Sequence, residues 1–308
     1  MKDRKISRRT ASKLLALGST SLFIDPFSNI QKQDKMLSRL IPGTNEELPV
    51  IGLGTWQSFD VGTAASERDP LKEVLNVLID AGGSVIDSSP MYGRSEQVVG
   101  DLTTELNIKD KIFEATKVWI SGEDSGITQM NESMNLMKVK QMDLMQIHNL
   151  LDWKTHLKTL RQWKEEEKIR HIGITHYHSG GYEEVERILK TEEIDFLQIN
   201  YNLIVREAAE RILPLAQDKG VAVLINRPYQ GGALFKAFKS KPLPPWAKEF
   251  DAASWGQLFL KFILAHPAVT CVIPGTSKAK HMKDNVLAGF GNMPTEAHQK
   301  KMVQLIYS

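Results

Sequence analysis

The sequence has a single cysteine, almost no excess charge of either sign, and no long apolar run after its first few dozen residues. Because Cys271 has no second cysteine to pair with, an intrachain disulfide is excluded, and its place in the apolar run 269–273 predicts a buried, unreactive thiol. Without a long apolar run, no membrane-spanning helix is expected in the main part of the chain. The formal net charge of +2 gives no reason to expect a nucleic-acid partner.

The first 35 residues do not have the pattern of a folded domain. Basic residues precede a short, interrupted apolar segment at 14–24. Ser7-Arg8-Arg9 resembles a twin-arginine export signal, a route that carries folded proteins, although Ala11 and Ser12 stand where bulkier apolar residues are usual. We expect residues 1–35 to be an export signal, with a disordered basic tail as the alternative. The export machinery would then be a partner and the periplasm the location; otherwise the protein is cytoplasmic.

From Leu48 onward, short β-branched runs alternate with segments of helical periodicity. Strands are predicted at 49–55, 84–87, 112–117, 142–148, 169–175, 195–200, 221–225 and 269–273. A helix is predicted after each strand, and the first of these helices should open at Asp69-Pro70. A doubly wound sheet would usually carry G-x-G-x-x-G after its first strand, and that spacing is missing. Eight strand–helix units in about 250 residues match a (β/α)8 TIM barrel, which we expect as one domain over 36–308.

Residues suited to proton transfer follow three consecutive strands. Asp87 ends the second predicted strand and Tyr92 lies on its loop, while Lys117 ends the third strand and His148 the fourth. Parallel barrel strands bring their carboxyl ends to one mouth, so we expect these four side chains to meet there. A lysine ammonium about 4 Å from a phenol would lower the phenol pKa by roughly three units from about 10. The pattern therefore predicts a tyrosine that protonates a carbonyl oxygen, with a neutral histidine orienting the same oxygen.

Several motifs, in this order and at these separations, resemble the aldo-keto reductase superfamily. They are Gly52-Leu53-Gly54-Thr55-Trp56, residues 87–93, Ala115-Thr116-Lys117, Gln146-Ile147-His148 and Ile273-Pro274-Gly275-Thr276. The resemblance implies an NAD(P)H-dependent oxidoreductase that reduces an aldehyde or ketone to an alcohol, or the reverse, by hydride transfer. It also implies that Tyr92 is the general acid, that Asp87 and Lys117 tune it, and that His148 orients the substrate.

The same resemblance implies a set of cofactor contacts. The nicotinamide end would be held by Thr175, His176 and Gln198, with Asn226 at the place where an aromatic ring usually stacks. His176 replaces the asparagine usual at its position. The diphosphate and adenosine would lie on Gly275, Thr276, Ser277, Lys278, Asp284 and Asn285, where a helix N-terminus offers an anion site. Lys278 and Lys280 favour NADP(H) over NAD(H), and an ordinary solvated helix face is the alternative for these lysines.

Two tryptophans, Trp56 and Trp119, follow the first and third strands and should wall the substrate pocket. The chain ends soon after Ile306, which predicts an open mouth that accepts a small or broad range of carbonyl or sugar substrates. No metal is expected. Two other functions stay open at this point: a metal-dependent TIM-barrel hydrolase that uses His148, His176 and His178, and a non-catalytic cofactor-sensing subunit.

Overall fold

The structure, a computed structural model, describes residues 35–307. The predicted export signal lies outside this range. Within residues 35–307, no helix is both long and apolar enough to cross a bilayer.

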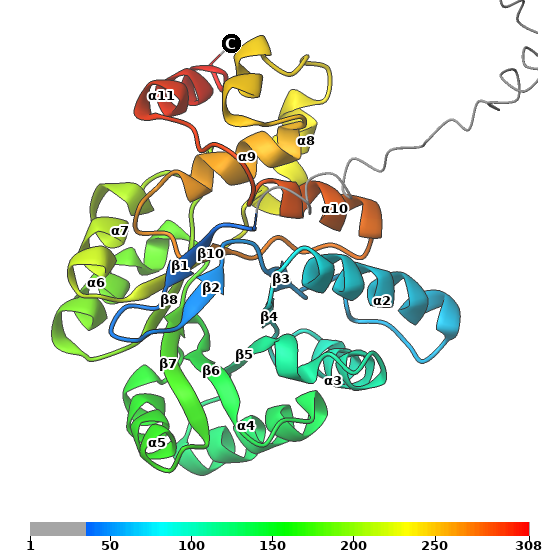
Figure 1. Cartoon of the computed structure of the whole chain (residues 1–308). Coiled ribbons are helices and arrows are strands. Elements are labelled where there is room, and N and C mark those ends of the chain that lie inside the picture. The colour runs from blue at the N-terminus through cyan, green and yellow to red at the C-terminus, as the bar shows by residue number, and fades with distance from the viewer. Residues whose placement is uncertain (1–34, 308) are drawn as a thin grey trace, which may run out of the picture. The chain divides into compact units, whose positions relative to one another are not determined.

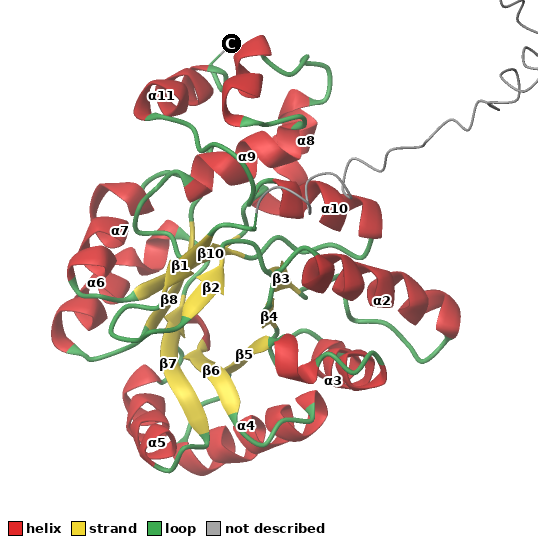
Figure 2. Cartoon of the chain, viewed as in Figure 1, coloured by secondary structure: helices red, strands yellow, loops and turns green. Residues whose placement is uncertain are grey.

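Eight parallel strands form one sheet, in the order β10-β9-β8-β7-β6-β5-β4-β3. Their bounds are β3 Leu53–Gly54, β4 Val85–Asp87, β5 Phe113–Val118, β6 Met142–Ile147, β7 Ile169–Thr175, β8 Phe196–Asn200, β9 Ala222–Asn226 and β10 Cys271–Val272. Single bridges from Ile51 to Val272 and from Gly54 to Gly275 join the first strand to the last. The sheet therefore closes on itself inside a ring of helices (Figure 2), and the predicted (β/α)8 barrel is confirmed.

Helices alternate with the strands and cover the outside of the barrel (Figure 1). They are α2 Ala65–Asp80, α3 Ser95–Glu105, α4 Glu123–Met137, α5 Trp153–Glu165, α6 Tyr182–Thr191, α7 Ala208–Asp218, α9 Trp255–Leu264 and α10 Ala279–Leu287. The excursion after β9 contains the short helix α8, Ala233–Phe238, and α11, Glu296–Gln304, follows α10.

The predicted start of the first helix at Asp69-Pro70 is wrong. Helix α2 begins at Ala65 and includes Pro70. Arg68 stabilises this extra turn, because its side chain donates to the carbonyl of Gly62 and pairs with Asp101 on α3. A proline near a helix start therefore marks the first turns of the helix, and not its first residue.

The alternation of side chains along each strand decides what fills the barrel. A buried apolar layer is formed by inward-facing residues that include Val85, Phe113, Ala115, Leu144, Phe196, Ala222, Leu224 and Cys271. Burial raises the pKa of the Cys271 thiol, in agreement with the unreactive cysteine that the sequence predicts. Because inward side chains recur every second residue, the next layer toward the strands' carboxyl ends contains Asp87, Lys117, Gln146, Gln198 and Asn226. This second layer is polar, and it forms the floor of the barrel mouth.

A two-stranded hairpin, β1 Ser38–Leu40 and β2 Glu47–Pro49, precedes the barrel and was not predicted. Ile41 and Leu48 from this hairpin belong to the apolar core at the amino ends of the strands. Arg39 donates to the carbonyls of Leu264 and His266 at the end of α9. The hairpin thus covers the end of the barrel opposite the polar layer.

Candidate active site

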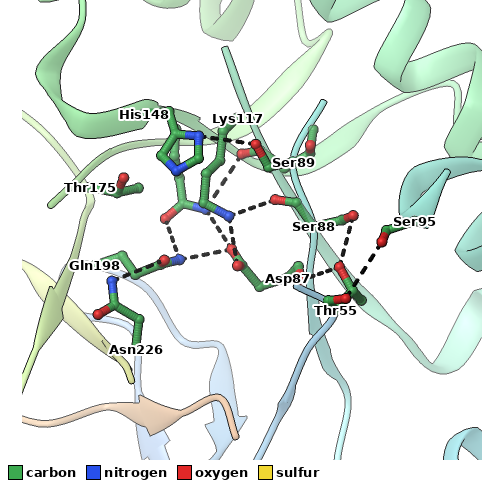
Figure 3. Close-up of polar contacts among 12 residues, drawn as sticks. Thr55, Asp87, Ser88, Ser89, Ser95, Lys117, His148, Thr175, Gln198 and Asn226 are labelled. Carbon is green, nitrogen blue, oxygen red and sulfur yellow. Dashed lines mark hydrogen bonds and ion pairs between the residues drawn. The ribbon is translucent and has the colours of Figure 1, made fainter. Parts of the chain in front are cut away.

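The polar layer is organised around a buried ion pair between Asp87 and Lys117 (Figure 3). The Nζ atom of Lys117 lies 2.6 Å from Oδ2 of Asp87 and 2.6 Å from the carbonyl oxygen of Ser88. Burial acts to lower the pKa of Lys117, but Asp87 and Tyr92 outweigh it and hold that pKa above its usual value. Two of the three ammonium N–H donors are therefore occupied, and the third is available to the phenol of Tyr92.

Tyr92 lies beside this ammonium, but its phenol is not unusually acidic. The Nζ atom of Lys117 is 5.1 Å from the centroid of the Tyr92 ring. Burial raises the pKa of the phenol, the positive charge of Lys117 lowers it, and the carboxylate of Asp87 cancels part of that charge, so the net pKa lies above its ordinary value. The prediction of a lowered pKa is wrong because it left out the burial of the phenol. At neutral pH Tyr92 keeps its proton, as an acid that acts on a carbonyl must.

His148 lies next to Tyr92, with the ring centroids 5.9 Å apart in an edge-to-face arrangement. Burial, Lys117 and His176 lower the pKa of His148 to about 3, so the imidazole is neutral, as the sequence predicts. Its Nδ1 atom is 3.0 Å from the hydroxyl oxygen of Ser89. That oxygen also accepts the backbone N–H of Met91. In the tautomer in which Ser89 donates to Nδ1, the imidazole proton lies on Nε2, where it can be donated.

A row of side-chain amides connects Asp87 to the opposite wall of the mouth. Oδ1 of Asp87 accepts from Nε2 of Gln198 at 2.8 Å and from Nε2 of Gln146 at 2.9 Å. Nε2 of Gln198 also lies 3.1 Å from Oε1 of Gln146, and Nδ2 of Asn226 donates to Oε1 of Gln198 at 3.4 Å. Gln146 was not among the predicted site residues. The alternation from Leu144 along β6 was the signal that could have placed it inside the barrel.

The side of the mouth expected to hold the nicotinamide contains buried acceptors without partners. Within residues 35–307, Oδ1 of Asn149 and Oδ1 of Asn226 are buried and make no hydrogen bond. The backbone N–H of Asn149 donates to the hydroxyl of Thr175 at 3.2 Å, which places Asn149 beside that predicted contact. Asn149 was also missed, although it directly follows His148. These two oxygens can accept N–H groups from a ligand.

His176 lies at the same level but is engaged with its own loop. Its Nδ1 atom is 2.9 Å from the carbonyl oxygen of His178, and its ring packs so tightly that a Cβ on Gly181 would lie 2.4 Å from it. Burial lowers the pKa of His176. The structure therefore places this ring against the loop after β7 and leaves Thr175 as the polar group of that strand inside the mouth.

The segment from Gly275 to Lys278 connects β10 to the start of α10. Thr276 is buried and its hydroxyl accepts the backbone N–H of Lys278 at 3.1 Å, while Ser277 and Lys278 are exposed. No side chain caps the N-terminus of α10, so its first N–H groups are free for an anion.

Asp284 and Asn285, on α10, already have partners within the protein. The carboxylate of Asp284 accepts from Ser254 and from Gln257, each at 2.7 Å. Oδ1 of Asn285 accepts from the hydroxyl of Tyr229 at 2.5 Å. A ligand that used these two acceptors would have to share them with α9 and with the loop after β9.

Exposed apolar side chains gather after the carboxyl ends of the strands, at the rim of the mouth. All but three of the exposed large apolar side chains in residues 35–307 follow the carboxyl end of a barrel strand; they are Trp56, Met91, Trp119, Ile120, Tyr177, Ile204 and Phe235. The ring centroid of Trp119 is 6.1 Å from that of His148, which brings this predicted substrate residue to the site. Trp56, which is 48% exposed, lies on the rim after β3.

The fold and the buried ion pair beside a neutral histidine agree with the result of a comparison with known families. A model of the aldo/keto reductase family matches residues 50–302. The chain belongs to the aldo/keto reductase family. The four predicted proton-transfer residues of this aldo/keto reductase thus lie within the matched range and meet at one mouth.

Individual relatives of this aldo/keto reductase are distant. It is 25% identical over 200 residues to aldo-keto reductase YhdN of Bacillus subtilis, a match that spans 60% of each chain. It is 25% identical to methylglyoxal reductase YeaE of Escherichia coli over 77% of this chain and 84% of that one. Among solved structures, an aldo/keto reductase of Klebsiella pneumoniae, in complex with NADP and acetate, superposes with a TM-score of 0.73 at 22% identity, covering 86% of this chain and 94% of that one.

The residues present fit a nicotinamide dinucleotide. A carboxamide carries N–H donors, which match the unpartnered oxygens of Asn149 and Asn226. A diphosphate carries negative charge, which matches the uncapped N-terminus of α10. For metals, no group of three or more histidine, cysteine or acidic side chains within residues 35–307 is arranged to hold an ion.

Proposed function

We propose that this protein reduces an aldehyde or ketone to the alcohol, or catalyses the reverse reaction, with NADPH as hydride donor and Tyr92 as proton donor. The observation that carries the proposal is the meeting of Tyr92, Lys117 and His148 at one barrel mouth, although they come from three different strand ends. Methylglyoxal reductases among the relatives, and the NADP in the similar Klebsiella structure, support the same reaction class.

The side chains divide the proton chemistry among them. The phenol of Tyr92 gives its proton to the carbonyl oxygen, and the ammonium of Lys117 stabilises the phenolate that remains. Asp87 and the carbonyl of Ser88 hold that ammonium in place. Neutral His148 donates from Nε2 to the same substrate oxygen. When bound, the cofactor supplies the hydride.

NADP(H) is the preferred cofactor in this proposal. Lys278 and Lys280 are exposed at the start of α10, next to its free N–H groups. Two lysines in this position attract a ribose 2′-phosphate more strongly than a 2′-hydroxyl. NAD(H) would lack this attraction and should bind more weakly.

The preferred substrates in this proposal have an apolar body. The rim offers Trp119, Met91 and Phe235 to the part of the substrate that projects from the site. Burial of each added methylene contributes about 0.8 kcal/mol, so kcat/KM should rise roughly fourfold for each added methylene along a series of short aldehydes.

The test follows nicotinamide absorbance with purified protein, NADPH or NADH, and a panel of aldehydes, ketones and sugars. Tyr92→Phe removes the phenolic hydroxyl and keeps the ring, so carbonyl reduction should fall by about 10²- to 10⁴-fold. Tyr307→Phe, at an exposed tyrosine, is the matched control and should keep the parental rate. If the Tyr92→Phe variant reduces carbonyls at the parental rate, Tyr92 is not the proton donor. NADPH binding without any turnover over the panel would instead support the cofactor-sensing alternative.

We also propose that residues 1–35 direct export by the twin-arginine route. Arg8-Arg9 after Ser7, followed by an apolar segment, supports this. A reporter fused to residues 1–35 should reach the periplasm of a bacterium that has this route. Replacing both arginines by lysine should keep the reporter in the cytoplasm, and unchanged export of that variant would contradict the proposal.

A further inference from the structure

Gln146 is fully buried under the mouth, and each polar atom of its side chain is used within the protein. Its Nε2 atom donates to Oδ1 of Asp87 at 2.9 Å and lies 3.4 Å from the carbonyl oxygen of Thr116. Its Oε1 atom accepts from Gln198 at 3.1 Å. No polar atom of Gln146 is left for a substrate, so any role in the reaction must act through Asp87 or Gln198.

The orientation of this amide is fixed by charge. A flipped Gln146 would point its carbonyl oxygen at the carboxylate of Asp87, which is repulsive, and would turn its NH₂ toward the NH₂ of Gln198. The observed direction brings two N–H donors to one carboxylate oxygen, from Gln146 and Gln198, while Lys117 takes the other oxygen.

Hydrogen bonds to a buried carboxylate spread its negative charge. With two amides on Oδ1, Asp87 draws less strongly on the ammonium of Lys117. Lys117 then keeps one N–H group, and more of its electrostatic attraction, for the phenol of Tyr92. The Nζ atom of Lys117 lies 5.1 Å from the centroid of the Tyr92 ring. Without Gln146 the ammonium would be drawn more strongly toward Asp87 and away from Tyr92.

We propose that Gln146 is a positioning residue for the proton donor, which supports Asp87 so that Lys117 remains directed at Tyr92. This inference rests on the proposed function, since it concerns the same proton transfer. Gln146 also supports Gln198, whose Nε2 it shares with Asp87, so it links the ion pair to the amide row that leads to Asn226.

The first variant, Gln146→Met, keeps the length of the side chain and removes both donor and acceptor. We expect kcat for carbonyl reduction to fall about tenfold, the value of one hydrogen bond to a charged group, with KM unchanged because no substrate contact is lost. NADPH affinity, from a fluorescence titration, should stay within about twofold. Gln141→Met is the control, because Gln141 is exposed and bonds only to the carbonyl of Glu167; it should leave all three quantities unchanged.

The second variant, Gln146→Glu, separates positioning from packing. In its protonated form the introduced carboxyl can donate to Asp87 as the amide does, and when ionised it repels Asp87. Activity should therefore approach the parental rate at the acidic end of the profile and fall as pH rises, a limb that the parent lacks. Gln146→Met, which cannot titrate at this position, should lack this limb and show its lower kcat at every pH.

A third measurement needs no turnover. The ¹⁵N resonance of the Lys117 ammonium should move in Gln146→Met and stay in place in Gln141→Met. Unchanged kcat together with an unchanged lysine resonance in Gln146→Met overturns the inference, while parental turnover leaves the proposed function intact. If the parent binds NADPH but reduces no carbonyl, the proposed function fails; the lysine resonance then decides the positioning of Lys117 by itself.

Discussion

The two sides of the barrel mouth differ in how their polar groups are satisfied. On the proton-donor side, defined by Asp87, Tyr92, Lys117 and Gln146, no buried side-chain atom lacks a partner within residues 35–307. On the cofactor side, defined by Asn149, Thr175, Asn226 and residues 275–278, two amide oxygens lack partners and a helix start has no cap. The buried groups of the proton-donor side have partners within the protein, whereas the cofactor side has two oxygens and a helix start that a ligand can engage. Substitutions should therefore affect stability on the first side and ligand affinity on the second.

The largest effect is expected from breaking the ion pair. Both side chains are almost fully buried, at 1% and 3% exposure for Lys117 and Asp87. Lys117→Met leaves an unpaired buried carboxylate, so the free energy of unfolding should fall by about 3–5 kcal/mol at pH 7, measured by urea denaturation.

The control for the ion pair is the double variant Asp87→Asn/Lys117→Met, which removes both charges. It should recover part of the lost stability, because no uncompensated charge remains. If the free energy of unfolding of Lys117→Met falls by less than about 1 kcal/mol, Asp87 is in contact with water. The contrast between a satisfied proton-donor side and an open cofactor side would then be wrong.

A smaller effect, and of a different kind, is expected at Asn226. Its hydrogen bonds to His176 and Gln198 are long, at 3.2 and 3.4 Å, and its Oδ1 atom has none. Asn226→Ala should therefore change the free energy of unfolding by less than about 1 kcal/mol, while NADPH affinity, measured by fluorescence titration, should fall about tenfold. Asn131→Ala, at an exposed position of α4, is the control. Lost stability with unchanged NADPH affinity would remove the distinction between the two sides.

The sequence predicts the barrel well because periodicity depends on burial. The strand predicted at 169–175 is β7 to the residue, and the ends of the next strands differ by one or two residues. The hairpin β1–β2 was missed because its strands have three residues each, too few to show alternation. Helix α2 starts before Pro70, in a turn where Arg68 pairs with Asp101, a contact that is distant in sequence.

The site is only partly predictable, for a related physical reason. The meeting of Asp87, Lys117 and His148 could be predicted, because neighbouring parallel strands place their carboxyl ends side by side. The pKa of Tyr92 was predicted in the wrong direction because desolvation depends on every neighbour, and a sequence does not show them. Gln146 was not predicted because the role of a glutamine in a strand depends on its hydrogen-bond partners, which the sequence does not show.

The smallest effect concerns the protonation of His148. Its pKa is about 3 in the folded protein, because of burial and of Lys117, against 6.5 for the ordinary group. A folded state that binds fewer protons than the unfolded state loses stability as pH falls, so the contribution of His148 is complete above about pH 6.5 and declines below it. Between pH 6.5 and 5.5 the decline should be about 1 kcal/mol. Urea denaturation over this range measures it.

His148→Gln keeps a donor and removes the titrating ring, so it should flatten this decline. The pH dependence of the parent's free energy of unfolding does not report on His148 alone. Burial also lowers the pKa values of His171 and His176, which contribute in the same pH range. The difference between the parental and His148→Gln slopes reports the contribution of His148. Equal slopes for the parent and His148→Gln would mean that His148 accepts a proton readily when folded. It would then carry charge beside Lys117 and compete with Tyr92 as the acid, and the proton-donor side would no longer have a single donor.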